Sequence, residues 1–379
     1  MKKYCKNVNI FDINLVYSAV LNCLKPAKTR RRSDTIALFA KILKTDKKEA
    51  LQILESKDDK FYWVASRISH KLINEMKSGH ITFPKYRIRI IKCPHSHKDR
   101  KITILTIKHL LLDHIAVFGL KDLSKRIGEF QVSSIKNRGA HYGAKFIKKW
   151  LQGKKAKYVA KVDIKKYYDS INHTILFAWL DKHVKNPKLL WLVKTLVTEV
   201  TTGLAIGSYL SQNLANLFLS DIYHFAIEKC RNKRGKPMIS HCVFYLDDMA
   251  YFGPNKRNLA KAIELIEVEL SKLGLSIKPN WNVFEITKER PLDMMGFRFH
   301  RGFTTIRKRI FKHLRRSYLR AVKKMFRFKE LSLHSAKSAV SYYGYLKATS
   351  VHLKYERMVY PWIFNKISEN DLRLTANII

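Results

Sequence analysis

The spacing of apolar residues changes several times along the chain and divides it into helical and extended segments. In residues 1–78 apolar positions recur at helical spacing, as in INLVYSAVLNCL and DTIALFAKIL, which predicts a mostly helical N-terminal extension. Residues 81–107 alternate instead, which predicts two strands around the polar turn PHSHKD. The apolar run at 108–118 then predicts a helix.

Two later segments place carboxylates at the ends of predicted strands. YVAKVDI predicts a strand that ends in Asp163, and HCVFYLDDMAYFG predicts a strand, a tight turn and a second strand, with Asp247 and Asp248 at the turn. Adjacent carboxylates repel each other, and a divalent cation would remove this repulsion. Each aspartate alone has an ordinary structural explanation, because Asp is common in turns and helix caps. The three together, on strands that could meet in one sheet, favour a metal site.

Two further segments combine glycine with the start of a helix. Arg138-Gly139 precedes a helical run from near His141, where the helix N-terminus would favour an anion. GLAIGSYLSQNLANLFL predicts a small-residue loop and then a helix from about Ser211, with Gln212 in its first turn. Gln212 could hydrogen-bond a base or a sugar, or merely cap the helix.

The last third of the chain is helical and strongly basic. A periodic helix is predicted from residue 258, and PLDMMGFRFHRGFTTIRK predicts another hairpin. Residues 307–329 contain eleven Lys or Arg among 23 residues, which predicts an amphipathic helix with a dense cationic face suited to a phosphate backbone. The apolar residues near its other face are Ile310, Leu314, Tyr318, Val322 and Met325.

The net charge points to a class of partner. The 379 residues include 74 Lys or Arg and only 30 Asp or Glu, a net charge of +44 spread along the whole chain. Such a charge repels itself in a compact protein, so we expect a polyanion as partner, and nucleic acid is the obvious one. An anionic membrane is the alternative, but no amphipathic anchor or lipidation signal stands out. Cations of the first hairpin, Lys98 and Arg100 among them, could clamp a triphosphate or a backbone, unless they are simply solvated.

Cysteine and histidine usage excludes other classes. The five cysteines form no CxxC pair, and the fifteen histidines form no HExxH motif, which argues against a disulfide framework and a zinc ribbon. The N-terminal MKKYCKNVNIFDIN turns polar too soon for a secretory signal, and the longest apolar stretch is interrupted by Lys108, His109, Asp113 and His114. We therefore expect a cytoplasmic protein that does not span a membrane.

Several motifs, taken in order, resemble those of reverse transcriptases. YLDD at 245–248 matches the YxDD signature, VDIKKYYDSI resembles the first palm motif, and AIGSYLSQNLANLFL the following one. MMGFRF resembles the primer-grip hairpin, and SSIKNRGAHYG the fingers motif upstream of the palm. The resemblance covers residues 81–300 and implies an α+β fold with right-hand polymerase architecture, in which an antiparallel sheet and helices form the palm. The implied parts are an N-terminal helical extension (1–78), fingers and palm (79–302) and a basic helical thumb (303–379).

The resemblance also implies roles for individual residues. Asp163, Asp247 and Asp248 are the expected catalytic aspartates, and with the backbone of Ile164 they would hold two Mg²⁺ ions, for which Mn²⁺ can substitute. Such a pair of ions activates a 3′-hydroxyl and stabilises the leaving pyrophosphate. Tyr168 takes the position of the steric-gate aromatic and predicts a preference for dNTP over NTP. The other expected dNTP contacts are Arg100, Gln212 and Lys98, and the expected nucleic-acid contacts are Arg138, Tyr245, Gly296, Lys308, Arg309, Arg315 and Arg316.

The chain also departs from the family's pattern. Trp281 stands where many relatives carry a lysine, with Lys278 close but shifted, and Met295 stands where Leu is commoner. No segment resembles an RNase H, integrase or HNH endonuclease domain. A compact protein of this kind is most similar to bacterial reverse transcriptases of diversity-generating retroelements and of defence systems, with retrons as a further group.

Three functional hypotheses remain from the sequence. The first is an RNA-directed DNA polymerase that copies a dedicated RNA, in anti-phage defence by resemblance, or in a diversity-generating retroelement or retron. The second is template-independent or protein-primed DNA synthesis at the same site. The third is a non-catalytic RNA-binding scaffold. The expected partners are template RNA, DNA product and dNTPs, with a cognate non-coding RNA, an accessory protein and a second copy of the chain left open.

Overall fold

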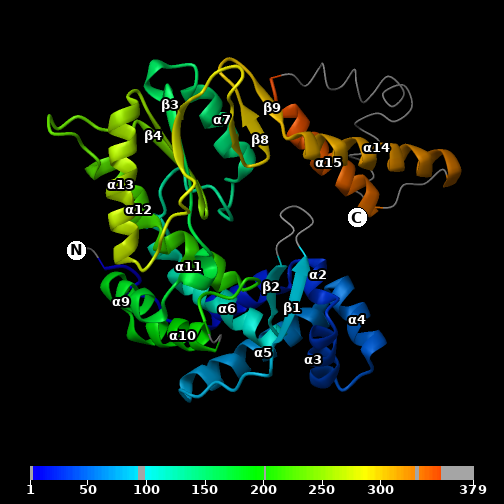
Figure 1. The fold of residues 1–379 in the computed structure, drawn as a ribbon. Helices are drawn as coiled ribbons and strands as arrows, with labels where there is room; N and C mark the ends of the chain where they lie inside the picture. Colours follow the sequence, from blue (N-terminus) through cyan, green and yellow to red (C-terminus); the bar gives the residue numbers. More distant parts are fainter. Residues whose placement is uncertain (1–2, 93–98, 200–201, 329–332, 351–379) are drawn as a thin grey trace. The chain divides into compact units, whose positions relative to one another are not determined.

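The computed structural model describes residues 3–92, 99–199, 202–328 and 333–350 (Figure 1). The chain forms two compact units, each assembled from three separate stretches. The first unit comprises Met1–Gly128, Lys165–Asp221 and Glu269–Ser276, and the second comprises Glu129–Ile164, Ile222–Val268 and Ile277–Ile379. The α+β class predicted from the sequence is confirmed. The three-part division at residues 78 and 302 stays a prediction.

The N-terminal part of the first unit is helical, as the apolar spacing predicts. Its helices are α1 (Ile13–Leu24), α2 (Ala27–Arg30), α3 (Ser33–Leu43), α4 (Lys47–Ser56) and α5 (Asp59–Lys77). Asp12, Asp46 and Asp58 cap α1, α4 and α5, because each side chain accepts hydrogen bonds from backbone N–H groups of the first turn. Helices α1, α3, α4 and α5 each bury apolar side chains.

A two-stranded antiparallel ribbon follows, as predicted. Strands β1 (Arg87–Lys92) and β2 (Asp99–Ile104) pair so that Arg100 lies opposite Ile91, and the Arg100 side chain is exposed. The predicted turn, including Lys98, lies outside the described residues.

The first unit is built around helix α6 (Ile107–Gly119), which confirms the helix predicted at 108–118. Helix α6 packs against α1, α10 and α11. The remaining elements that lie within this unit are η1 (Leu120–Arg126), α8 (Tyr167–Ser170), α9 (His173–His183), α10 (Pro187–Thr198) and α11 (Tyr209–Phe218).

The second unit contains a four-stranded antiparallel sheet in the order β4-β5-β3-β6 (Figure 1). Its strands are β3 (Tyr158–Asp163), β4 (His241–Tyr245), β5 (Asp248–Gly253) and β6 (Asn282–Glu285). In β3 and β5 the residues between the two ends are mostly fully buried, because both faces of the sheet are covered. Val159 and Phe252 join one apolar cluster, and the alternate residues Ala160 and Tyr251 are buried as well. The register pairs Asp163 with Asp248.

The hairpin predicted at PLDMMGFRFHRGFTTIRK is extended by a third strand. Strands β7 (Leu292–Met294), β8 (Phe297–Phe299) and β9 (Thr304–Ile306) form a separate antiparallel sheet, because the chain turns back once more after β8. The apolar side chains of this sheet join the same core as the first sheet. Its turn contains Gly296 at a φ of 88°, where an added Cβ would lie 2.6 Å from a methyl carbon of Ile310, so a glycine is required there.

Helices complete the second unit. Helix α7 (Ala140–Trp150) and the pair α14 (Lys308–Phe328) and α15 (Leu333–Lys347) contribute to the core, and α14 packs along α15 (Figure 1). Helix α14 is amphipathic as predicted: Leu314 and Tyr318 are buried, whereas Arg315 and Arg316 are exposed. The other elements are η2 (Lys154–Ala156), the π-helix η3 (Phe225–Lys229), and α12 (Ser220–His224) and α13 (Lys256–Lys272), whose residues divide between the two units.

In the described segments, no helix is both long enough and apolar enough to cross a bilayer.

Candidate functional site

The YLDD turn joins β4 to β5 and places two carboxylates beside the end of β3. Leu246 sits at a φ of 56°, a left-handed conformation that costs a non-glycine residue about 1–2 kcal/mol. The neighbouring backbone holds the turn in place, since the Ile164 N–H donates to the Asp247 carbonyl over 3.2 Å. Asp248 begins β5 and faces Asp163 across the ladder. The sheet therefore brings the three predicted aspartates together.

Asp248 is the most constrained of the three carboxylates. Burial raises its pKa to about 6, Lys161 and then Arg307 oppose this shift, and the charges of Asp163 and Asp247 add to it. Among the described residues, its Oδ1 atom is buried and lacks a hydrogen-bond donor. Lys161 Nζ lies 3.5 Å from this oxygen, which permits charge attraction without hydrogen-bond geometry. The site thus contains a buried anionic oxygen that can accept a further ligand.

Two lysines offset the repulsion among the aspartates. Lys161 also donates to the Asp293 carbonyl over 2.8 Å, which fixes its ammonium near Asp248. Lys278 Nζ lies 3.3 Å from Asp163 Oδ1, and the Lys278 N–H donates to the Asp163 carbonyl over 2.8 Å. Sequence reasoning missed Lys161, although its position two residues before Asp163 on one strand places both on the same face. It noted Lys278 only as a shifted residue.

The donor set fits magnesium. Three carboxylates at adjacent strand ends are the hard oxygen ligands that this ion prefers, and the buried Asp248 Oδ1 has no competing donor among the described residues. As the side chains lie, no group of three or more His, Cys, Asp or Glu in the described segments surrounds one point closely enough to hold an ion.

The residues predicted to contact a dNTP lie in the first unit, on elements joined by the loop from Gly203 to Ser208. The Leu204 N–H donates to the Tyr168 carbonyl over 2.8 Å, and the Thr103 N–H donates to the Ile206 carbonyl over 2.9 Å. The loop thereby connects α8, which carries the half-buried Tyr168, to β2.

The same loop leads into α11. Tyr167 on α8 donates its hydroxyl hydrogen to the Ala215 carbonyl of α11 over 2.6 Å. Gln212 lies on α11 with its side chain exposed. Helix α11 begins at Tyr209, slightly earlier than expected, and Ser208 is its N-cap. The arrangement brings the elements that carry Arg100, Tyr168 and Gln212 into one hydrogen-bonded group.

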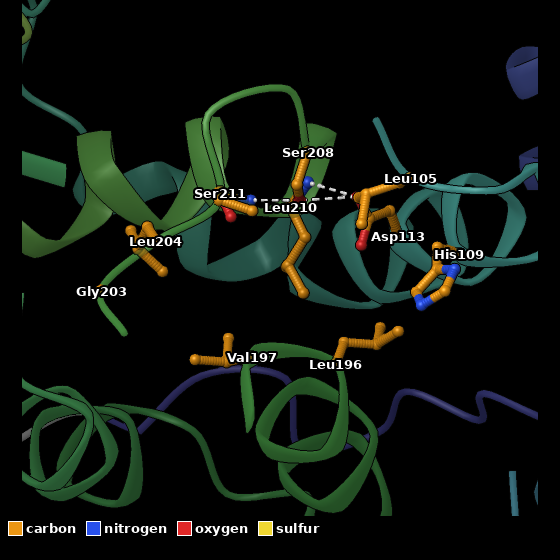
Figure 2. A pocket seen from close by; sticks show the side chains of 11 residues that line it. Leu105, His109, Asp113, Leu196, Val197, Gly203, Leu204, Ser208, Leu210 and Ser211 are labelled. Carbon is orange, nitrogen blue, oxygen red and sulfur yellow. Dashed lines mark hydrogen bonds between the residues drawn. The ribbon is translucent and has the colours of Figure 1, made fainter. Parts of the chain in front are cut away.

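A small cavity lies beside the start of α11, between α6 and α10 (Figure 2). Its volume is about 10 Å³, and two buried polar residues of α6, His109 and Asp113, line it. Burial lowers the pKa of His109 to about 4 and raises the pKa of Asp113 to about 6. His109 Nδ1 is hydrogen-bonded to Thr106 Oγ1, but its Nε2 has no hydrogen-bond partner among the described residues.

These two shifts predict opposing pH effects on stability. The stabilising contribution of Asp113 is complete below its unfolded pKa of 3.8 and is lost as pH rises through about 6. That of His109 is complete above 6.5 and is lost as pH falls through about 4. Each amounts to about 3 kcal/mol, so between pH 7 and pH 4 the two nearly cancel.

Single replacements should separate the two effects. When the pH is lowered from 7 to 4, the unfolding free energy of Asp113→Asn should fall by about 3 kcal/mol relative to that of the unmodified protein. The unfolding free energy of His109→Gln should rise by a similar amount in the same comparison. Urea unfolding at both pH values measures this, and the shared titration of all other groups cancels in the comparison. An identical pH dependence in the two variants would refute the assignment.

The predicted nucleic-acid contacts lie in the second unit. Arg138 precedes α7 and donates from Nη1 to the Gln131 carbonyl over 3.2 Å, so part of its hydrogen-bonding capacity is structural. Tyr245 ends β4 and is half-buried, and Gly296 is in the β7–β8 turn. On α14, Lys308 is exposed like Arg315 and Arg316, whereas Arg309 is half-buried.

Comparison with known protein families agrees with this geometry. Residues 85–299, more than half of the chain, match the family model described as reverse transcriptase (RNA-dependent DNA polymerase). The chain therefore belongs to the reverse transcriptase family, a class of nucleotidyltransferases that copy RNA into DNA from dNTPs and generally use Mg²⁺. No curated protein matches the chain.

Proposed function

We propose that this protein extends a primer with dNTPs on a dedicated RNA template, and that Asp163, Asp247 and Asp248 form its catalytic centre. The observation that carries the proposal is the pairing of Asp163 with Asp248 across the β3–β5 ladder, next to a buried carboxylate oxygen without a donor in the described residues. A carboxylate cluster of this kind is costly for a protein that only binds RNA, because burial raises the free energy of the charged form.

The chemistry of the site follows from these residues. Magnesium, held by the three aspartates and the Ile164 carbonyl, would activate the 3′-hydroxyl of the primer and neutralise charge on the triphosphate. Lys161 lies beside Asp248 and Lys278 beside Asp163, and their positive charges would offset the repulsion among the carboxylates until these engage a ligand. We propose two ions, with Mn²⁺ as a substitute.

Residues of the first unit would select the nucleotide. Arg100, exposed on β2, would contact the triphosphate, and Tyr168 would exclude a ribose 2′-hydroxyl by contact with its ring. Gln212 on α11 would contact the base or the sugar.

The steric-gate assignment predicts altered sugar selection. Tyr168→Val should raise the ratio of NTP to dNTP incorporation by about tenfold or more, because removing the ring opens the space for a hydroxyl. Single-nucleotide incorporation with matched dNTP and NTP measures the ratio. Tyr167→Phe, which removes only the hydroxyl bonded to Ala215, is the neighbouring control and should change the ratio less. Unchanged selection in Tyr168→Val would remove the assignment.

The basic face of α14 predicts a salt-dependent contact with template and primer. Replacing Lys308, Arg315 and Arg316 by Gln should weaken binding and reduce the slope of log K against log salt by up to about 3. The same charge change on α13, at Lys256, Arg257 and Lys261, is the matched control. Fluorescence anisotropy across a salt series gives both slopes. If only the control changed the slope, α14 would not be the nucleic-acid face.

The experiment that tests the proposed function identifies the template. The protein and its Asp247→Asn, Asp248→Asn variant are purified from the native host, and all accompanying RNA and DNA is sequenced. A discrete RNA with both proteins, and complementary DNA only with the unmodified one, supports templated synthesis. DNA that matches no bound RNA would favour untemplated or protein-primed synthesis, and RNA without DNA would favour the scaffold hypothesis.

The cellular setting is part of the proposal. The sequence resemblance supports a role in anti-phage defence, with a diversity-generating retroelement or a retron as the alternative. A cytoplasmic location suits the cysteines of the described segments, which are buried and form no disulfide there: Cys5, Cys23, Cys230 and Cys242.

A further inference from the structure

The first turn of α11 is anchored by a carboxylate from another helix. Asp113 on α6 is 3% exposed, and its Oδ2 accepts hydrogen bonds from the Ser208 hydroxyl at 2.6 Å, the Tyr209 N–H at 3.1 Å and the Leu210 N–H at 3.4 Å. Figure 2 shows Asp113 directed toward Ser208 at the edge of the cavity. The Ser208 hydroxyl oxygen in turn accepts from the Ser211 N–H over 3.0 Å.

This arrangement is more than an ordinary helix cap. A single N-cap serine satisfies one of the free N–H groups at the start of a helix. Here a second, buried anion satisfies two more and is favoured by the helix dipole. Asp113 also orients the Ser208 hydroxyl, since that group donates to Asp113 and accepts from the helix. The start of α11 is thus held in one position relative to α6.

The anchored residue closes the loop that connects the dNTP-contacting elements. From Ser208 the loop runs back through Ile206, which accepts from Thr103 of β2, to Leu204, which donates to the Tyr168 carbonyl. Two glycines allow these close approaches. An added Cβ would lie 2.2 Å from the Tyr168 carbonyl oxygen at Gly203 and 2.6 Å from the Thr103 carbonyl oxygen at Gly207. Because a Cβ would clash at both points, we expect a displacement of Ser208 to be transmitted to α8 and β2.

We propose that Asp113 is a positioning residue for nucleotide selection. By anchoring Ser208 and the first turn of α11, it keeps Tyr168, Gln212 and the strand that carries Arg100 at fixed positions relative to one another. The inference rests on the proposed function of those three residues. Asp113 lies outside the roles assigned from the sequence and acts only through the loop and the helix that it anchors.

Kinetics separate positioning from general stability. Asp113→Asn should raise the KM for dNTP by about tenfold with a smaller loss in kcat, and should lower discrimination against NTP by several-fold, because small displacements of binding groups are costly. A purely structural role would lower kcat through loss of folded protein, with KM and discrimination unchanged. Asp181→Asn, an exposed acidic residue of α9 in the same unit, is the matched control and should match the unmodified enzyme.

Two variants of Ser208 test the proposal even if Asp113→Asn does not fold. Ser208→Ala removes the hydroxyl that links Asp113 to α11 and should shift KM and discrimination in the same direction, whereas Ser208→Thr keeps the hydroxyl and should restore both. Combining Ser208→Ala with Asp113→Asn should add little, since both remove one interaction. Equal kinetics for the Ala and Thr variants would overturn the proposal.

Amide hydrogen exchange tests the anchor independently of any activity. In Asp113→Asn the amides of Tyr209, Leu210, Leu204 and Thr103 should exchange at least about tenfold faster, while those of α9 stay unchanged. Unchanged exchange at Leu204 and Thr103 would overturn the transmission through the loop. If the amides respond but the unmodified protein incorporates no dNTP, the proposed function fails and the anchor stands.

Discussion

Replacing Asp247 or Asp248 by Asn is expected to lower dNTP incorporation by at least about 1,000-fold. Asn has the shape of Asp but carries no charge, so it binds magnesium poorly, and metal stabilisation of the reacting phosphate is worth several kcal/mol. The measurement is primer extension on an RNA template at saturating dNTP, compared with the unmodified protein at equal folded concentration.

The free energy of unfolding shows whether the loss of dNTP incorporation comes from the chemical step or from unfolding of the protein. Because desolvation and the charges of Asp163 and Asp247 disfavour the ionised form of the partly buried Asp248, removing its charge should leave the free energy of unfolding at pH 7 unchanged or raised. Glu285→Gln is the matched control on β6 of the same sheet, where the exposed carboxylate pairs loosely with Lys157 at 3.8 Å, and it should retain activity. Full biological activity of Asp247→Asn would instead favour the RNA-binding scaffold.

Gly203→Ala is expected to cause the largest loss among changes far from the aspartates in sequence. Its Cβ would lie 2.2 Å from the Tyr168 carbonyl oxygen and 2.8 Å from the Asp169 Cα, and both obstacles are backbone atoms that cannot rotate away. The residue also sits at a φ of 59°. The variant should lose more than about 3 kcal/mol of unfolding free energy, or displace α8 and lose dNTP binding.

Gly79→Ala separates the clash from the backbone conformation. Gly79 is in the same unit at a φ of 72°, but nothing lies within 4 Å of an added Cβ. Gly79→Ala should therefore lose only about 1–2 kcal/mol of unfolding free energy, the cost of placing an alanine in the left-handed conformation. Urea unfolding and the KM for dNTP are measured for both variants. Equal losses for the two would mean that the loop moves freely and that close packing at Tyr168 is unimportant.

The elements near the site could largely be predicted because local signals agreed. Short apolar runs marked the strands that end in Asp163 and that flank the YLDD turn, and helical spacing marked α6, α11 and α14. The third strand β9, which has three residues like β7 and β8, was not predicted as a separate strand.

The interactions around the site could not be predicted, because they join residues far apart in the chain. Lys278 reaches Asp163 only through the bridge between Ile164 and Ile277, and Asp113 meets Ser208 across 95 residues of sequence. Neither residue type is informative by itself: Lys is the commonest charged residue of this chain, and an aspartate within an apolar helix reads as an interruption.

The sequence by itself determined the family, the three carboxylates and the cationic face of α14, because short motifs and periodicity carry that information. Only the tertiary structure decided how those carboxylates are tolerated, with Lys161 and Lys278 beside them, and which buried group anchors the loop behind Tyr168. The physical reason is that charge and burial depend on distance in space, which no local pattern of residues specifies.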